Sequence, residues 1–161
     1  MNKNTRYLTA AGMIAAVYTV LCLLLRPLSF SVIQVRIAEA LCILPYFSPA
    51  AVPGLTIGCF LANVLGGADL PDVIFGTLAT LIGAVGSRLL KKHRFLVPLP
   101  PILANTIILP FVFRFAYGEA LPLLLMMGSV CLGEMVSAGV LGILLLMMLE
   151  KYRGTIFFEG R

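Results

Sequence analysis

Carboxylates and amides placed inside long apolar stretches are the residues of this sequence that could do chemistry. Glu134 is the clearest case, because it lies about halfway along an apolar run in the segment VCLGEMVSAGV, among small residues. A lone carboxylate is costly in lipid, so it must face a cavity or a polar partner. We expect Glu134 to bind a ligand; the alternative is a structural ion pair with Arg36 or Arg114.

Arg36 and Glu39 form a second candidate group. They are three residues apart at the start of an expected helix, which places both side chains on one face. On that face they either pair with each other or reach a ligand, and the sequence leaves both interpretations open.

Other polar residues lie at the ends of apolar segments or interrupt them. Asn63 lies near one such end, and Asn105 interrupts the segment PPILANTIILP. Asp72 precedes the apolar run VIFGTLATLIG, where a carboxylate either contacts a ligand or caps the helix N-terminus. Asp69 is expected to be a solvated loop residue. The predicted substrate-binding residues are therefore Arg36, Glu39, Asn63, Asp72, Asn105 and Glu134.

Motifs for catalysis and ATP hydrolysis are missing from the sequence. It has no Walker P-loop, HExxH or GxSxG motif, and its four cysteines lie in apolar segments without a CxxC pair. We therefore expect no metal or other cofactor, and a transporter subunit in place of an enzyme. A membrane-embedded enzyme acting on a lipid is the alternative. It would need a catalytic dyad or an aspartate-rich metal motif, and only Asp69 and Asp72 come near that.

The elements that position these residues are predicted to be membrane helices. Of the 161 residues, 60% are hydrophobic and 12% are charged, whereas soluble domains are about half apolar and about a quarter charged. A spanning helix needs about 20 apolar residues, and the segments 7–25, 73–90, 97–116 and 121–149 qualify. Only short polar joints separate the apolar stretches, so we expect a single transmembrane domain over residues 1–161.

Residues 37–65 contain Pro45, Pro49 and Pro53 and form either one kinked helix or a hairpin of two short helices. Lysine and arginine favour cytoplasmic loops, and two helices put both termini and the basic loop at 91–94 on that side. We therefore predict an all-α, multi-pass bundle of six transmembrane helices with both termini cytoplasmic. This topology accounts for the net charge of +5 without nucleic acid as a partner.

Small residues recur four apart in the first expected helix, in the segment TAAGMIAAVYTV. Ala11 and Ala15 form one such pair, and Gly12 and Ala16 form another. Small residues at this spacing allow two helices to approach closely, so the pattern predicts helix packing here.

The segment IQVRIAEALCILPYFSPAAVPGLTIGCFLANVLGG, followed by DVIFGTLATLIGA, resembles the signature of the QueT family. The resemblance extends from about Ala10 to Leu149. QueT proteins are substrate-binding S components of energy-coupling factor (ECF) transporters. The resemblance implies a six-helix subunit of the cell membrane that binds substrate outside and works with a membrane coupling subunit and two cytoplasmic ATPases. It also implies that Ala11 and Ala15 contact the coupling subunit.

The resemblance further implies uptake of a queuosine precursor, either 7-aminomethyl-7-deazaguanine or queuine. A carboxylate can accept two hydrogen bonds from the pairing edge of a deazaguanine, and an Asn or Arg can donate to its O6. The cationic aminomethyl group favours a second carboxylate. On this basis we expect Glu134 and Glu39 to be the two carboxylates, in either order, with the remaining polar edge read by Asn63, Asn105 and Arg36.

Asp72 is a weaker candidate for this site, and Phe30, Phe60 or Phe75 could stack on the ring. Two alternatives within transport stay open. One is an S component for another vitamin or purine-like compound. The other is an ion-coupled carrier that works without partners and uses Glu134 as its proton site.

Overall fold

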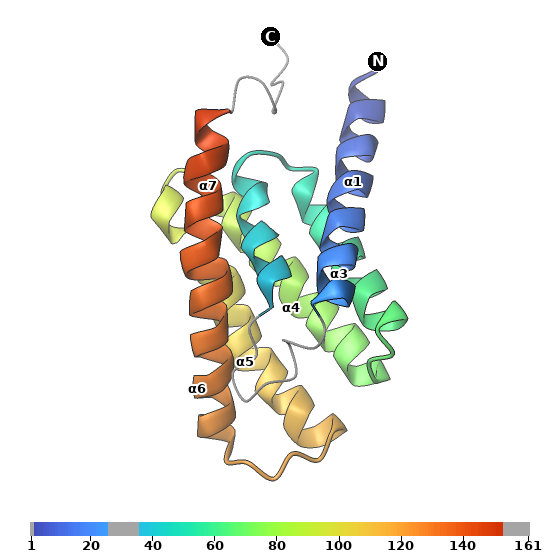
Figure 1. The fold of residues 1–161 in the computed structure, drawn as a ribbon, viewed down its shortest axis with the longest axis vertical. Coiled ribbons are helices and arrows are strands. Elements are labelled where there is room, and N and C mark those ends of the chain that lie inside the picture. Colours follow the sequence, from blue (N-terminus) through green and yellow to red (C-terminus); the bar gives the residue numbers. More distant parts are fainter. Residues whose placement is uncertain (1, 26–35, 153–161) are drawn as a thin grey trace.

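In the computed structural model, which describes residues 2–25 and 36–152, the chain folds into a bundle of helices (Figure 1). No strand occurs within these two ranges. The predicted all-α class is therefore confirmed. The helices are α1 (Lys3–Leu24), η1 (Ile37–Tyr46), α3 (Ala51–Leu65), α4 (Leu70–Leu89), η2 (Arg94–Leu96), α5 (Leu99–Ala116), α6 (Leu123–Glu134), η3 (Met135–Leu141) and α7 (Gly142–Lys151).

The long apolar segments predicted from the sequence are helices that suit a membrane. Within the described residues, four stretches are long and apolar enough to cross it: Lys3–Leu24, Leu70–Leu89, Arg94–Ala116 and Leu123–Lys151. Their outward faces carry large apolar side chains such as Leu24, Leu124 and Met148, which are mostly exposed. Such faces are suited to contact with lipid, and the fold is that of a multi-pass membrane bundle.

Residues 37–65 form two short helices, η1 and α3, as one of the two sequence interpretations predicts. Pro45 lies at the end of η1, and its carbonyl accepts a hydrogen bond of 3.0 Å from Nη1 of Arg88 in α4. Successive helices run in alternating directions, so the start of α1 and the end of α7 lie at the same end of the bundle (Figure 1). Six membrane crossings and cytoplasmic termini stay predictions, because η1 and α3 are shorter than the roughly 20 residues of a full span.

Helix α1 packs closely against α3 through small residues. A Cβ atom on Gly54 would lie 2.8 Å from the carbonyl oxygen of Ala11, and one on Gly58 would lie 2.9 Å from that of Ala15. The side chains of Ala11 and Ala15 are consequently buried inside this chain. Their predicted contact with a coupling subunit stays a prediction, and they are not part of the open surface of α1.

The last three helical elements form one continuous helix that changes its winding after Glu134. Residues 135–141 form a π-helical segment, η3, between α6 and α7. Wider turns of this kind are rare and occur frequently at functional sites. The π segment begins directly after the carboxylate that stands out most in the sequence.

Candidate functional site

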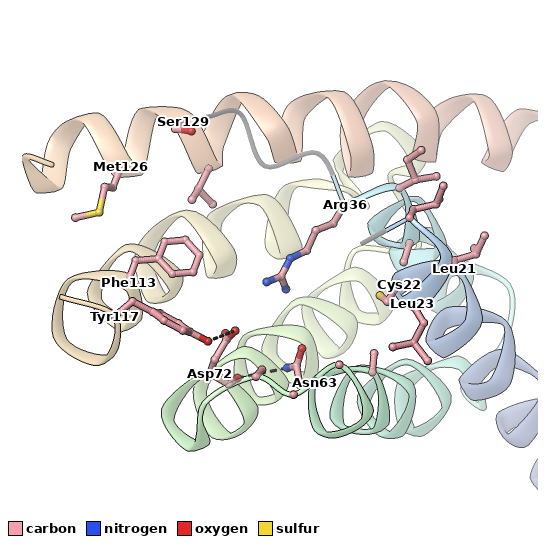
Figure 2. A pocket seen from close by; sticks show the side chains of 18 of the residues that line it. Leu21, Cys22, Leu23, Arg36, Asn63, Asp72, Phe113, Tyr117, Met126 and Ser129 are labelled. Atoms are coloured by element: carbon pink, nitrogen blue, oxygen red, sulfur yellow. Dashed lines mark hydrogen bonds between the residues drawn. The ribbon is translucent and has the colours of Figure 1, made fainter. Parts of the chain in front are cut away.

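A cavity of about 860 Å³ lies at one end of the bundle. Its walls come from the end of α1, the start of η1, the α3–α4 turn, the end of α5 and the middle of α6 (Figure 2). The volume falls within the range of roughly 300–1,000 Å³ that is typical of small-molecule sites. Three of the six predicted site residues line it, namely Arg36, Asn63 and Asp72.

Asp72 provides a buried carboxylate on the α4 side of the cavity. The hydroxyl of Tyr117 donates to its Oδ2 at 3.3 Å, whereas its Oδ1 is buried and has no hydrogen-bond partner among the described residues. Asn63 lies beside it and donates from Nδ2 to the Asp72 backbone carbonyl at 3.4 Å. Asp72 is not the N-cap that one interpretation of the sequence predicts, because α4 begins at Leu70. It lies inside the first turn, where a carboxylate suits the helix dipole.

The N-cap position of α4 belongs to Asp69, although its side chain makes no capping hydrogen bond. Asp69 is exposed, as the sequence predicts for a loop residue. Its backbone N–H donates to the Tyr117 hydroxyl at 3.3 Å. Tyr117 therefore connects the end of α5 to both Asp69 and Asp72.

Arg36 provides a cation on the other side of the same cavity. Figure 2 shows its guanidinium projecting from the start of η1 toward the side on which Asp72 and Asn63 lie. The side chain of Arg36 forms no hydrogen bond or ion pair with another described residue; the ion pair found in the described part of the chain joins Arg94 and Glu150 at 3.2 Å. Asp72 is a carboxylate on the lining of the same cavity. The two opposite charges thus face each other across the cavity without touching.

Glu39 lies outside the cavity lining and is satisfied by its protein neighbours. Its Oε1 accepts a hydrogen bond from the hydroxyl of Tyr18, and its Oε2 accepts one of 2.9 Å from the Cys42 thiol. The side chain is 1% exposed. Arg36 and Glu39 do not form the direct ion pair that is one of the two interpretations of the sequence. Of these two residues, Arg36 alone lines the cavity.

Glu134 and Asn105 also lie behind the cavity wall, where they contact each other. Nδ2 of Asn105 donates to Oε1 of Glu134 at 2.8 Å, and both side chains are buried. Oε2 of Glu134 and the hydroxyl of Ser137 are buried and find no hydrogen-bond partner within residues 2–25 and 36–152. The expected alternative of an ion pair with Arg114 is wrong, because Arg114 is exposed and donates to the carbonyl of Glu119.

The structure also corrects the aromatic candidates and adds new ones. Phe60 and Phe75 are about half exposed and do not line the cavity, and Phe30 lies outside the described residues. The aromatic residues that reach the cavity from α5 and the loop after it are Phe113 and Tyr117. Sequence reasoning missed both, because aromatics at the end of an apolar helix also suit the membrane interface.

Tyr117 lies beyond the last residue of α5, next to Asp72. Partial burial raises the pKa of its phenol above the ordinary value of 10.0; hydrogen-bond donation by the Asp69 backbone lowers this pKa, and the negative charge of Asp72 raises it further. Tyr117 therefore stays a neutral hydroxyl at ordinary pH and can donate to Asp72. The cavity as a whole offers a carboxylate, a guanidinium, an amide and aromatic faces, which is a set suited to binding a flat polar molecule.

Comparison with known proteins gives one family match and one curated relative. Residues 8–151 match the family model described as the QueT transporter. The chain is also similar to a protein of Lactococcus lactis subsp. cremoris (strain MG1363) named queuosine precursor transporter QueT, with 33% identity over 85 residues. That alignment covers 51% of this chain and 50% of the relative, so the match spans about half of the relative's length. No solved structure matches the chain.

Proposed function

Because the chain belongs to the QueT transporter family, we propose that it is the substrate-binding subunit of an ECF-type importer that captures a queuosine precursor outside the cell. The family match supports a transporter as opposed to an enzyme, and the similar Lactococcus protein is named for transport of queuosine precursors. The substrate is 7-aminomethyl-7-deazaguanine or queuine, which share the 7-deazaguanine ring. Energy for uptake comes from two cytoplasmic ATPases through a membrane coupling subunit.

The observation that carries this proposal is the cavity with Asp72 and Arg36 on facing walls. Within the described residues, one Asp72 oxygen and the Arg36 guanidinium have no partner. The buried carboxylate therefore requires hydrogen-bond donors, and the guanidinium requires an acceptor. A deazaguanine ring offers both, with N–H donors on its pairing edge and a carbonyl oxygen beside them. The ring face packs against the Phe113 side of the cavity.

The position of the cavity supports capture from outside. It lies at the end of the bundle opposite the start of α1, the end of α7 and the basic loop at 91–94 (Figure 1). Lysine- and arginine-rich ends favour the cytoplasm. With those ends inside the cell, the cavity is at the outer half of a multi-pass protein of the cell membrane.

The open surface of α1 is the proposed contact with the coupling subunit. Ala11 and Ala15 face α3, but Gly12 and Ala16 are exposed on the neighbouring face. A Cβ atom on Gly12 would meet no atom of the described residues within 4 Å. A helix of another subunit could therefore approach this face as closely as α3 approaches the other.

Equilibrium binding and thermal unfolding of the purified protein test this function. The ligands are 7-aminomethyl-7-deazaguanine, queuine, guanine and riboflavin, measured side by side in one detergent. A ligand that binds only the folded state raises its unfolding temperature. We expect stabilisation by the two deazaguanines alone. Stabilisation by riboflavin or by none of the four would show that the substrate is a different compound.

A further inference from the structure

We propose that Asp72 and Arg36 together select the deazaguanine ring by its 2-amino-6-oxo pattern. In the ligand-free protein the Tyr117 hydroxyl then occupies the position at Asp72 that a ligand N–H takes on binding. This inference rests on the proposed function and adds the residues that determine its specificity. It also assigns the carboxylate of the pairing edge to Asp72, whereas the sequence favours Glu39 and Glu134.

The hydrogen bonding of Asp72 leaves room for a stronger donor. The Tyr117 hydroxyl lies 3.3 Å from Oδ2, whereas a hydroxyl bonded to a carboxylate usually lies at about 2.5–2.7 Å. Oδ1 has no hydrogen-bond partner in the described part of the chain, although Asp72 is only 6% exposed. A buried carboxylate gains free energy from each donor that it acquires. The two adjacent N–H groups of a guanine-type edge, at N1 and the 2-amino group, are donors of the required geometry.

Arg36 supplies the complementary contact. A guanidinium only donates hydrogen bonds, and this one has no partner among the described residues. The carbonyl oxygen at position 6 lies beside the N–H groups of the pairing edge. A ring that places its donors on Asp72 therefore holds this oxygen next to that contact, in the space into which the guanidinium of Arg36 projects (Figure 2).

Asp72 and Arg36 together disfavour the binding of an adenine-type ring. Such a ring carries an unprotonated acceptor at N1 and an amino group at position 6. In the same orientation it would place an acceptor against the carboxylate of Asp72 and a donor against the guanidinium of Arg36. Leaving buried polar groups unpaired in this way discriminates strongly between related ligands.

Glu39 and Glu134 are less suited to this contact. Both oxygens of Glu39 already accept hydrogen bonds, from Tyr18 and from Cys42. Glu134 accepts one from Asn105 on a neighbouring helix. Neither residue lines the cavity, so a ligand would have to displace part of the wall to reach them.

Calorimetric binding to the full-length protein tests the assignment with two matched ligands. One is 7-aminomethyl-7-deazaguanine, and the other is its analogue without the 2-amino group. We expect Asp72→Asn to weaken binding of the first ligand about 10- to 100-fold. Loss of the 2-amino group should likewise weaken binding to the wild type about 10-fold, but should change binding to Asp72→Asn much less.

Two further variants make the result specific. Glu150→Gln makes the same carboxylate-to-amide change at the other end of the bundle and should bind both ligands as the wild type does. Arg36→Gln provides an independent test of the assignment if Asp72→Asn does not fold. It should reduce the preference of the protein for the 6-oxo ligand over its 6-amino counterpart about 10-fold or more.

Several results would overturn the assignment. One is an equal loss for both ligands in Asp72→Asn, and another is an Arg36→Gln protein with unchanged preference. A third is that the effect of the 2-amino group disappears in Glu134→Gln and persists in Asp72→Asn. All of these leave the proposed function intact, since the wild type still binds a deazaguanine. A wild type that binds neither ligand would overturn the proposed function itself.

Discussion

Asn105 of α5 donates a hydrogen bond of 2.8 Å to Glu134, the last residue of α6, and both side chains are buried in the bundle. This contact joins two helices that also form part of the cavity wall. Glu134, which is an isolated acid in the sequence, thus has a protein partner in the fold. The pair supports the wall behind the cavity and does not form its surface.

Removing the side-chain amide of Asn105 alone should destabilise the protein. Asn105→Leu would leave both oxygens of Glu134 without a donor, and a buried group left unpaired costs about 1–3 kcal/mol, or more for a charge. We expect a lower unfolding temperature in detergent. The double variant Asn105→Leu/Glu134→Leu should recover much of the loss, because neither polar group is then buried unpaired.

Thr106→Val provides the matched control on the same helix. The hydroxyl of Thr106 is buried and has no hydrogen-bond partner among the residues that the structure describes. Its replacement by a methyl group should therefore leave stability unchanged or slightly raised. If Asn105→Leu and Thr106→Val unfold at the same temperature, the bond between Asn105 and Glu134 contributes nothing to stability.

The close contact of α1 with α3 gives a second stability prediction. A Cβ atom on Gly58 would lie 2.9 Å from both the Ala15 carbonyl oxygen and the Cβ atom of Tyr18. Gly58→Ala should therefore push the helices apart and cost about 1–3 kcal/mol. Thermal unfolding measures the loss. Gly12→Ala, which adds a methyl group in open space on α1, should cause none, and equal effects of the two changes would contradict this packing.

The outer face of α1 gives a prediction for assembly. Gly12→Leu would place a large side chain on the surface proposed for the coupling subunit, although the isolated chain has room for it. We expect normal unfolding of the isolated protein and weaker co-purification with the coupling subunit and ATPases. Leu8→Ala, at an exposed position one turn earlier, tests whether any change on this face has the same effect. Full assembly of Gly12→Leu would show that the coupling subunit binds elsewhere.

Most of the fold could be predicted because lipid demands long apolar helices. The prolines of residues 37–65 indicated the break between η1 and α3, and charge distribution favoured two helices over one. Helix α1 begins at Lys3 and not at Tyr7, because lysine and arginine side chains can extend from a helix end into the interface. The π segment at 135–141 was not predicted, since no residue in it requires a wider turn.

The site was predicted only in part, and for one physical reason. Hydropathy shows that Glu39, Asn105 and Glu134 are polar groups within apolar helices, but it does not show whether the partner is a ligand or another side chain. Glu39 and Glu134 have protein partners that come from distant segments, Tyr18 and Asn105. Asp72 is the weaker candidate in the sequence because helix capping explains an acid at a helix start equally well.

The hydroxyl of Tyr117 should make stability depend on alkaline pH. Partial burial raises its pKa above 10.0 in the folded protein, the Asp69 N–H opposes this shift, and the charge of Asp72 adds to it. The unfolded chain therefore loses this proton at lower pH than the folded one. The contribution of Tyr117 to stability is complete below pH 10.0 and is lost as the pH rises through the raised value.

Thermal unfolding of the wild type and Tyr117→Phe between about pH 8 and about pH 11 measures this contribution. We expect the wild type to lose stability with rising pH more steeply than Tyr117→Phe, since phenylalanine has no proton to release. The difference should be small, because Tyr117 is 44% exposed and water screens its charge. Using one buffer series for both proteins cancels the effect of the other titrating groups. Parallel curves would mean that the Tyr117 phenol is not held next to Asp72 in solution.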